Sequence, residues 1–213
     1  HVWPAAGIVV TSLISSHLLH WWDLLPSSVQ VAFQSYKLSG EQLLKLSDFS
    51  VYIQPVKGVS LNRFVTQYTG IDEKLLAKEG IYLEMAKKQV IEYLLNFNFQ
   101  DTILLGWDLM NDIMMFNRLF NYNEDMIDIG SFRWVDLSKV FTKLHNLPHS
   151  ISLEKACEMY DFTDPDFHNA TNDVVNTVKL LECLIDKFKV NKVLYETKET
   201  TVKKSIKKEK SIL

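Results

Sequence analysis

The chain has 213 residues, of which 47% are hydrophobic, 12% aromatic and 23% charged, and its formal net charge is −3. This length and composition allow one hydrophobic core of ordinary size and exclude a disordered or fibrous chain. The two cysteines, Cys157 and Cys183, lie far apart without CxxC or Cys/His metal spacing, which favours a reducing, cytoplasmic setting.

Charge is distributed unevenly along the chain. From Lys187 onward there are nine Lys and three Glu, whereas the residues before it carry 14 basic and 23 acidic side chains. We therefore expect one folded domain over residues 1–186 and a Lys-rich, disordered tail over residues 187–213. An acidic domain argues against broad duplex binding, and a basic tail could add a phosphate contact. A solvated C-terminus explains the same composition equally well.

The N-terminal stretch is poor in charge, because residues 1–36 hold only one charged side chain, Asp23. Residues 4–22 are apolar enough to raise a signal-peptide or membrane hypothesis. However, no Lys or Arg precedes them, and His17 and His20 interrupt them. We therefore expect a buried first strand here and no stable association with a membrane.

Three strands are expected next to one another at the start of the chain. Residues 7–10 form a short apolar run, and residues 29–38 alternate between apolar and polar side chains. Ser39, Gly40 and Glu41 (residues 39–41) supply a turn, and residues 49–53 form a third strand that stops before Pro55. This order predicts an antiparallel meander.

Helical and strand patterns alternate through the rest of the chain. The apolar run at residues 102–106 is typical of a buried strand, and residues 133–137 read as a strand entering a helix. Helical spacing of apolar residues predicts helices at residues 61–68, 82–95, 112–120, 138–144, 153–160 and 170–188, with a short helical turn at 72–76. A meander followed by this alternation predicts an α/β fold, in which helices flank a mixed β-sheet.

Three segments carry residues that could do chemistry. FSVYIQPVKGVSLNRFVTQYTGIDEKLL contains a Thr-Gly-Ile stretch, and ILLGWDLMNDIMMFNRLF leads from an apolar strand to Asp112. HNATNDVVNTVKLLECL places His168 five residues before Asp173, so one helix start can present an imidazole and a carboxylate to the same cleft. In this order, the segments resemble the DEDDh family of 3′–5′ exonucleases, which includes polymerase proofreading subunits and RNA-trimming exoribonucleases.

The resemblance implies a ribonuclease H-like domain that acts on the 3′ end of a single-stranded nucleic acid. Such enzymes place two cations, Mg²⁺ or Mn²⁺, about 3.5–4 Å apart at the scissile phosphate. Asp112 and Asp173 would then be metal ligands, and His168 would be the general base. Asp108 is the alternative acid of the second motif, because the alignment could slip by four residues.

Each of these residues also has an ordinary structural explanation. Asp112 could simply be an acid that stabilises a helix N-terminus, and His168 and Asp173 could be solvated polar residues. We expect four further residues to be polar surface: His145, His149, Asn169 and Asn172. Four aromatic residues could stack on bases, although such residues are more often core: Tyr52, Phe64, Tyr68 and Trp107.

The sequence departs from the family at the first motif, which is Asp-x-Glu at the end of the first strand. The matching residues here are Thr11, Ser12 and Leu13. Two or three carboxylates leave too little negative charge for two divalent cations, and neutral hydroxyls are poor substitutes. We therefore expect hydrolysis to be weak or lost. The alternative function is an inactive nucleic-acid-binding or scaffolding module with the same fold.

Overall fold

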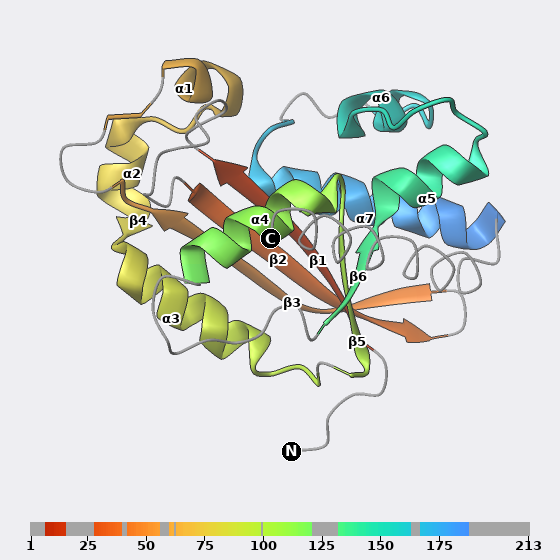
Figure 1. Ribbon diagram of the computed structural model, residues 1–213, viewed down its shortest axis with the longest axis horizontal. Coiled ribbons are helices and arrows are strands. Elements are labelled where there is room, and N and C mark those ends of the chain that lie inside the picture. Colours follow the sequence, from red (N-terminus) through yellow and green to blue (C-terminus); the bar gives the residue numbers. More distant parts are fainter. Residues whose placement is uncertain are drawn as a thin grey trace, which may run out of the picture.

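A computed structural model describes residues 7–15, 28–39, 42–55, 60–61, 63–98, 100–120, 132–162 and 167–187. Its centre is a six-stranded sheet in the order β4-β3-β2-β1-β5-β6 (Figure 1). The strands are β1 (Gly7–Ser15), β2 (Ser28–Ser39), β3 (Gln42–Ile53), β4 (Gly80–Ile81), β5 (Thr102–Gly106) and β6 (Arg133–Asp136).

The sheet is mixed. β1, β2 and β3 form an antiparallel meander, whereas β5 is parallel to β1 and β6 is parallel to β5. The two residues of β4 pair in parallel with the end of β3. The sequence-based expectation of an α/β fold with a mixed sheet flanked by helices is therefore confirmed.

Helices connect the strands and cover the sheet. They are α1 (Arg63–Thr69), α2 (Glu73–Glu79), α3 (Leu83–Leu94), α4 (Leu109–Phe120), α5 (Leu137–Leu144), α6 (Leu153–Glu158) and α7 (Ala170–Lys187). None of the helices among these described residues is long and apolar enough to cross a membrane.

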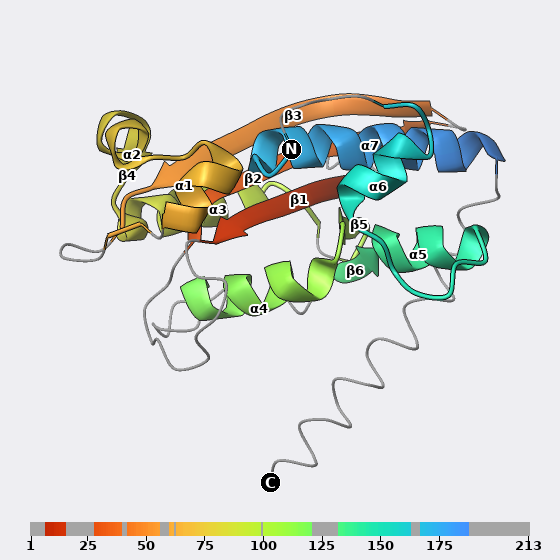
Figure 2. The same ribbon diagram turned by 90° about the horizontal axis from the view of Figure 1, so that it is seen from above.

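Strand alternation divides the core into two layers, one on each face of the sheet. Ile8 and Val10 of β1 pack with the buried residues of α5, α6 and α7. Val9, between them, packs with α3 and with Phe116 of α4 on the other face. Figure 2 shows α7 and α4 on either side of β1. Helices on both faces of the sheet therefore pack against the same strand, β1.

The element boundaries differ from the predicted ones mainly where local patterns are weak. β1 and β3 are longer than predicted, and the seven residues added at the start of β3 are exposed or half-buried. The predicted turn at 72–76 is helix α2, whose start is capped by Asp72 accepting a 2.7 Å hydrogen bond from the Leu75 amide. Gly70 ends α1 at a positive φ of 72°, as its position suggested. The turn residues Gly40 and Glu41 and the tail from residue 188 lie outside the described residues.

Candidate functional site

The middle of β1 meets the start of α4 across Gly106. A Cβ atom on Gly106 would lie 3.1 Å from the Thr11 carbonyl oxygen and 3.6 Å from Oδ2 of Asp112. Because Gly106 has no side chain, the first turn of α4 can approach β1 closely. The structure thus brings Asp112 next to the strand that holds the first motif in related sequences.

Asp112 and its alternative, Asp108, lie in different surroundings. Asp112 sits in the first turn of α4 and is only 9% exposed. Asp108 precedes the helix at a positive φ of 52° and accepts a 2.8 Å hydrogen bond from the Asn111 amide. Partial burial and the nearby carboxylate of Asp136 raise the pKa of Asp108. The geometry therefore favours Asp112 as the acid that faces β1, and its catalytic role stays a prediction.

The sequence-based hypothesis that Thr11 takes the place of the first motif's Asp stays a prediction. Thr11 is 1% exposed, and its hydroxyl oxygen has no hydrogen-bond partner among the described residues. Alternation along β1 turns it to the same face as Val9, the face covered by α4. The described side chain at this point of β1 is therefore an uncharged hydroxyl, and a hydroxyl is a poor ligand for a divalent cation.

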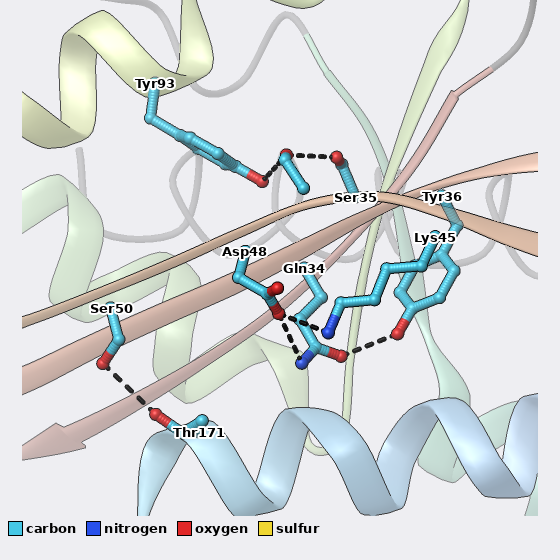
Figure 3. Close-up of polar contacts among 9 residues, drawn as sticks. Gln34, Ser35, Tyr36, Lys45, Asp48, Ser50, Tyr93 and Thr171 are labelled. Atoms are coloured by element: carbon cyan, nitrogen blue, oxygen red, sulfur yellow. Dashed lines mark hydrogen bonds and ion pairs between the residues drawn. The ribbon is translucent and has the colours of Figure 1, made fainter.

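The start of α7 is tied to β2 by a buried glutamine and to β3 by a threonine. Gln30 is 1% exposed, and its Oε1 accepts a 3.0 Å hydrogen bond from the Ala170 amide. Its Nε2 lies 3.4 Å from both the Asn169 side-chain oxygen and the Thr171 hydroxyl. Figure 3 shows Thr171 reaching from α7 to Ser50 of β3, a 3.2 Å hydrogen bond. Since Gln30 pairs with Ile14, this anchor lies at the end of β1.

A hydrogen bond joins His168 to Asp173 at the start of α7. The backbone amide of His168 donates a 3.1 Å hydrogen bond to Oδ1 of Asp173, and His168 has a positive φ of 69°. Burial raises the pKa of Asp173 to about 7, although the hydrogen bond from His168 opposes this shift. Burial lowers the pKa of His168, and the carboxylate of Glu154 partly opposes that change. The imidazole is therefore neutral at pH 7 and able to accept a proton.

The aromatic ring of Tyr68, in α1, packs against the imidazole of His168. The two ring centroids are 4.1 Å apart and the ring planes are tilted by 47°. Tyr68 remains 52% exposed. This contact brings α1 to the start of α7, and the two lie close together in both ribbon views (Figures 1 and 2).

The described residues do not form the site for two divalent cations that the family implies. Among them, no group of three or more His, Cys, Asp or Glu side chains could hold a metal ion. The carboxylates predicted to hold a cation are those of Asp112 and Asp173, and the residues matched to the first motif in the sequence, Thr11, Ser12 and Leu13, include no acid. Carboxylate oxygens are the ligands that Mg²⁺ requires, so this donor set does not fit the two-cation site.

Several sequence-based expectations need revision. The expectation that His145 is a surface residue is wrong, because its ring stacks on Phe141 at 4.0 Å and lies 3.0 Å from the Tyr160 hydroxyl. Trp107, by contrast, packs against the core, as expected for most such aromatic residues, and donates a 3.1 Å hydrogen bond to the Ile151 carbonyl. Gln30 was not predicted to be important, although a glutamine within the apolar strand SVQVAF is a signal of a buried polar contact. The side chain of Phe64 lies outside the described residues.

Comparison with known families identifies the class of this domain. A family model described as "DNA polymerase III subunit epsilon-like, C-terminal domain", of the DEDDh class, matches residues 77–184, half of the chain. No curated protein sequence is significantly similar to the chain. The matched range contains Asp112, His168 and Asp173, and it begins after β1, β2 and β3.

Solved structures of nucleases share the fold. Cell-death related nuclease 4 (CRN-4) superposes with a TM-score of 0.71 at 16% identity, covering 86% of this chain and 65% of that one. Exonuclease I of E. coli, in complex with a dA16 oligonucleotide, gives 0.72 at 14% identity, covering 90% and 42%. A 3′-exonuclease that recognises the histone mRNA stem-loop gives 0.68 at 13% identity, covering 86% and 64%. The chain thus spans less than two thirds of each of these structures.

Proposed function

Since the chain belongs to the DNA polymerase III subunit epsilon-like DEDDh family, we propose that it is an exonuclease-type domain that binds the 3′ end of a single-stranded nucleic acid. The observation that carries this proposal is the joined unit of His168 and Asp173 at the anchored start of α7. Asp112 approaches the middle of the same strand, at Thr11, from α4 on the other face of the sheet. The similar exonuclease I in complex with a dA16 oligonucleotide and the 3′-exonuclease with 3′-end specific recognition of a histone mRNA stem-loop support the choice of ligand.

In this proposal, hydrolysis by the chain as given is weak or absent. The family uses divalent cations, and the first motif here contributes no acid to hold them. A neutral His168 is able to take a proton from an attacking water, but a phosphodiester also requires its developing negative charge to be neutralised. Losing that stabilisation typically lowers the rate by about a thousand-fold or more.

A binding module without catalysis is the second candidate function, and Thr11 is the residue that favours it. Its buried hydroxyl makes the end of β1 neutral where an active enzyme needs charge. Both candidates share the 3′-end ligand, and they differ only in turnover. The proposal also keeps a cytoplasmic setting, which fits the burial of Cys157 in the core.

Binding and turnover are tested with 5′-labelled single strands in EDTA and then in Mn²⁺. We expect the chain to bind a linear oligonucleotide with a free 3′ end more tightly than a circular strand of the same sequence, which has no end. We expect little or no shortening of the linear strand in Mn²⁺. Equal affinity for the linear and circular strands would overturn 3′-end binding. Rapid shortening that survives Asp173→Ala would show that the active site lies elsewhere.

A further inference from the structure

β3 presents a long open edge of the sheet. Tyr52 and Ile53, at its end, pair with β4, whereas residues 42–51 have no strand on their outer side among the described parts of the chain (Figure 1). Leu44 and Leu46 on this open edge are each 48% exposed. An edge with exposed apolar side chains offers its unpaired backbone groups to a strand of another molecule, and a second copy of this chain carries the same edge.

A β-bulge interrupts the open edge close to its middle. Ser35 of β2 pairs with Ser47, and the next residue of β2, Tyr36, pairs with Lys45. Leu46 is therefore an extra residue that has no partner on β2. A bulge bends its strand and increases the local twist. It divides the open edge into two short stretches, 42–45 and 47–51, that do not continue in one line.

An ion pair lies beside the bulge. Nζ of Lys45 is 2.5 Å from Oδ1 of Asp48, and both side chains are exposed (Figure 3). The same oxygen of Asp48 accepts a 2.9 Å hydrogen bond from Nε2 of Gln34. A strand that approached this part of the edge would remove water from the two charges, which costs free energy. Lysine on an edge strand is a common protection against pairing with another chain.

We propose that the bulge at Leu46 prevents two copies of this chain from pairing through their β3 edges. This inference concerns the fold and is independent of the proposed function. Two identical edges that pair in antiparallel fashion are related by a two-fold axis, so a pairing along the whole open edge places that axis close to Leu46. The two bulges would then face each other. Hydrogen bonds alternate regularly along an antiparallel pair, and an extra residue in each strand interrupts this alternation at the axis.

Deleting Leu46 tests the inference directly. The deletion removes the bulge and leaves the pairs on both sides in register, because the pair of Ser35 and Ser47 is then followed at once by the pair of Tyr36 and Lys45. Sedimentation of the full chain at increasing concentration measures its mass in solution. We expect the unmodified chain to keep the mass of one copy and the deletion variant to reach twice that mass. Leu46→Ser, the matched control, keeps the bulge without the apolar side chain and should remain a single copy.

Hydrogen exchange locates the contact in the deletion variant. The outward-facing backbone amides of β3 should become protected as the dimer forms. Adding Leu44→Lys to the deletion places like charges on the two edges and should restore the single copy. A dimer that persists with Leu44→Lys, or that leaves the amides of β3 unprotected, would mean that the copies meet elsewhere and would overturn the inference.

Two further results would contradict the inference. One is a deletion variant that folds, as judged by thermal unfolding, and stays a single copy. The other is a dimer of the unmodified chain in which the amides of β3 are protected. If the deletion variant does not fold, hydrogen exchange of the unmodified chain decides. Outward-facing amides of β3 that exchange fast at every concentration support the inference, and protection that grows with concentration overturns it.

Discussion

At the scale of single residues, Thr11 is the position at which we predict that this chain departs from its family. Its buried hydroxyl has no hydrogen-bond partner among the described residues. The hydroxyl therefore makes no hydrogen bond that stabilises the described fold. Replacing it with Asp would bury a second carboxylate beside Asp112. Two carboxylates brought together repel each other unless a cation lies between them.

We predict that Thr11→Asp with Leu13→Glu destabilises the chain in EDTA by about 1–3 kcal/mol and makes it more stable in Mn²⁺ than in EDTA. The unmodified chain should unfold at the same temperature in both conditions. Thermal unfolding with and without Mn²⁺ measures the difference, and Thr11→Asn with Leu13→Gln is the neutral control.

Activity provides the second measurement on the same variant. The double substitution should recover measurable shortening of a single strand in Mn²⁺, and adding His168→Ala should remove it. If Mn²⁺ stabilises the neutral control as much as the acidic variant, the cation binds away from the end of β1.

The raised pKa of Asp173 predicts that the stability of the folded chain depends on pH. Its pKa is raised to about 7 in the folded chain, whereas an unfolded Asp titrates near 3.9. The folded state therefore holds the proton more tightly, and this contribution to stability is lost as pH rises from about 4 to about 7. Asp173→Asn should stabilise the chain at pH 8 by about 1–3 kcal/mol and have less effect at pH 5.

Urea unfolding of both proteins at each pH measures this effect. The pKa of His168 is lowered, so its contribution to stability changes with pH in the opposite direction. Both proteins contain His168, so comparing them at the same pH removes this contribution. A gain that is the same at pH 5 and pH 8 would mean that the Asp173 proton is not involved.

At the scale of elements, the anchoring of α7 depends on Gln30. Gln30→Leu would leave the Ala170 amide without its buried acceptor, a loss that costs about 1–3 kcal/mol. We predict that the Ala170 amide then exchanges its hydrogen faster than the rest of α7. Gln34→Leu is the matched control, because Gln34 is also buried on β2 but is bonded to Asp48 and Tyr36 (Figure 3).

Native-state hydrogen exchange distinguishes the two variants. Both should lower the free energy of unfolding, since each removes buried hydrogen bonds. Only Gln30→Leu should lose protection at the first turn of α7. Equal loss at that turn in both variants would show that α7 is held by general packing.

The sequence predicted most elements, because periodicity is a local property. The strand at 102–106 and the helix that begins at Ala170 lie where the apolar patterns placed them. The pairing of β3 with the two residues of β4 could not be predicted, because such a short strand has no periodicity of its own. The bond from Gln30 to Ala170 joins residues 140 positions apart, and no local pattern reports such a contact.

The candidate site was predictable in part for the same reason. The pair of His168 and Asp173 lies within five residues, so spacing on one helix start was sufficient to link them. The approach of Asp112 to Thr11 depends on Gly106 and on the parallel pairing of β1 with β5. The convergence of Asp112 with His168 and Asp173 on one cleft stays a prediction.

At the scale of the whole molecule, the family match and the first three strands occupy different parts of the chain. The family match covers residues 77–184, the range that contains Asp112, His168 and Asp173. The residues before it form β1, β2 and β3, and they complete the expected sheet although the first motif is changed. Strand pairing needs only backbone groups and apolar alternation, so the fold persists where the acids do not.

The charge distribution of the whole chain leads to the last prediction. Residues 188–213 contain eight Lys and three Glu, whereas the residues before Lys187 have an excess of nine acidic side chains, 23 against 14. Lysines that contact phosphates release counterions, so each contact on a single strand adds about 0.7 to the slope of log affinity against log salt. Deleting residues 188–213 should weaken binding of a single strand at low salt, reduce this slope and leave the unfolding temperature unchanged.

A full-length variant in which Lys203, Lys204, Lys207 and Lys208 are changed to Gln separates the effect of charge from the effect of length. This variant should reproduce part of the loss of affinity. Affinities measured between about 50 and 200 mM salt give the slope for each protein. An identical slope for the unmodified chain and both variants would mean that the lysines of the tail do not contact the bound strand.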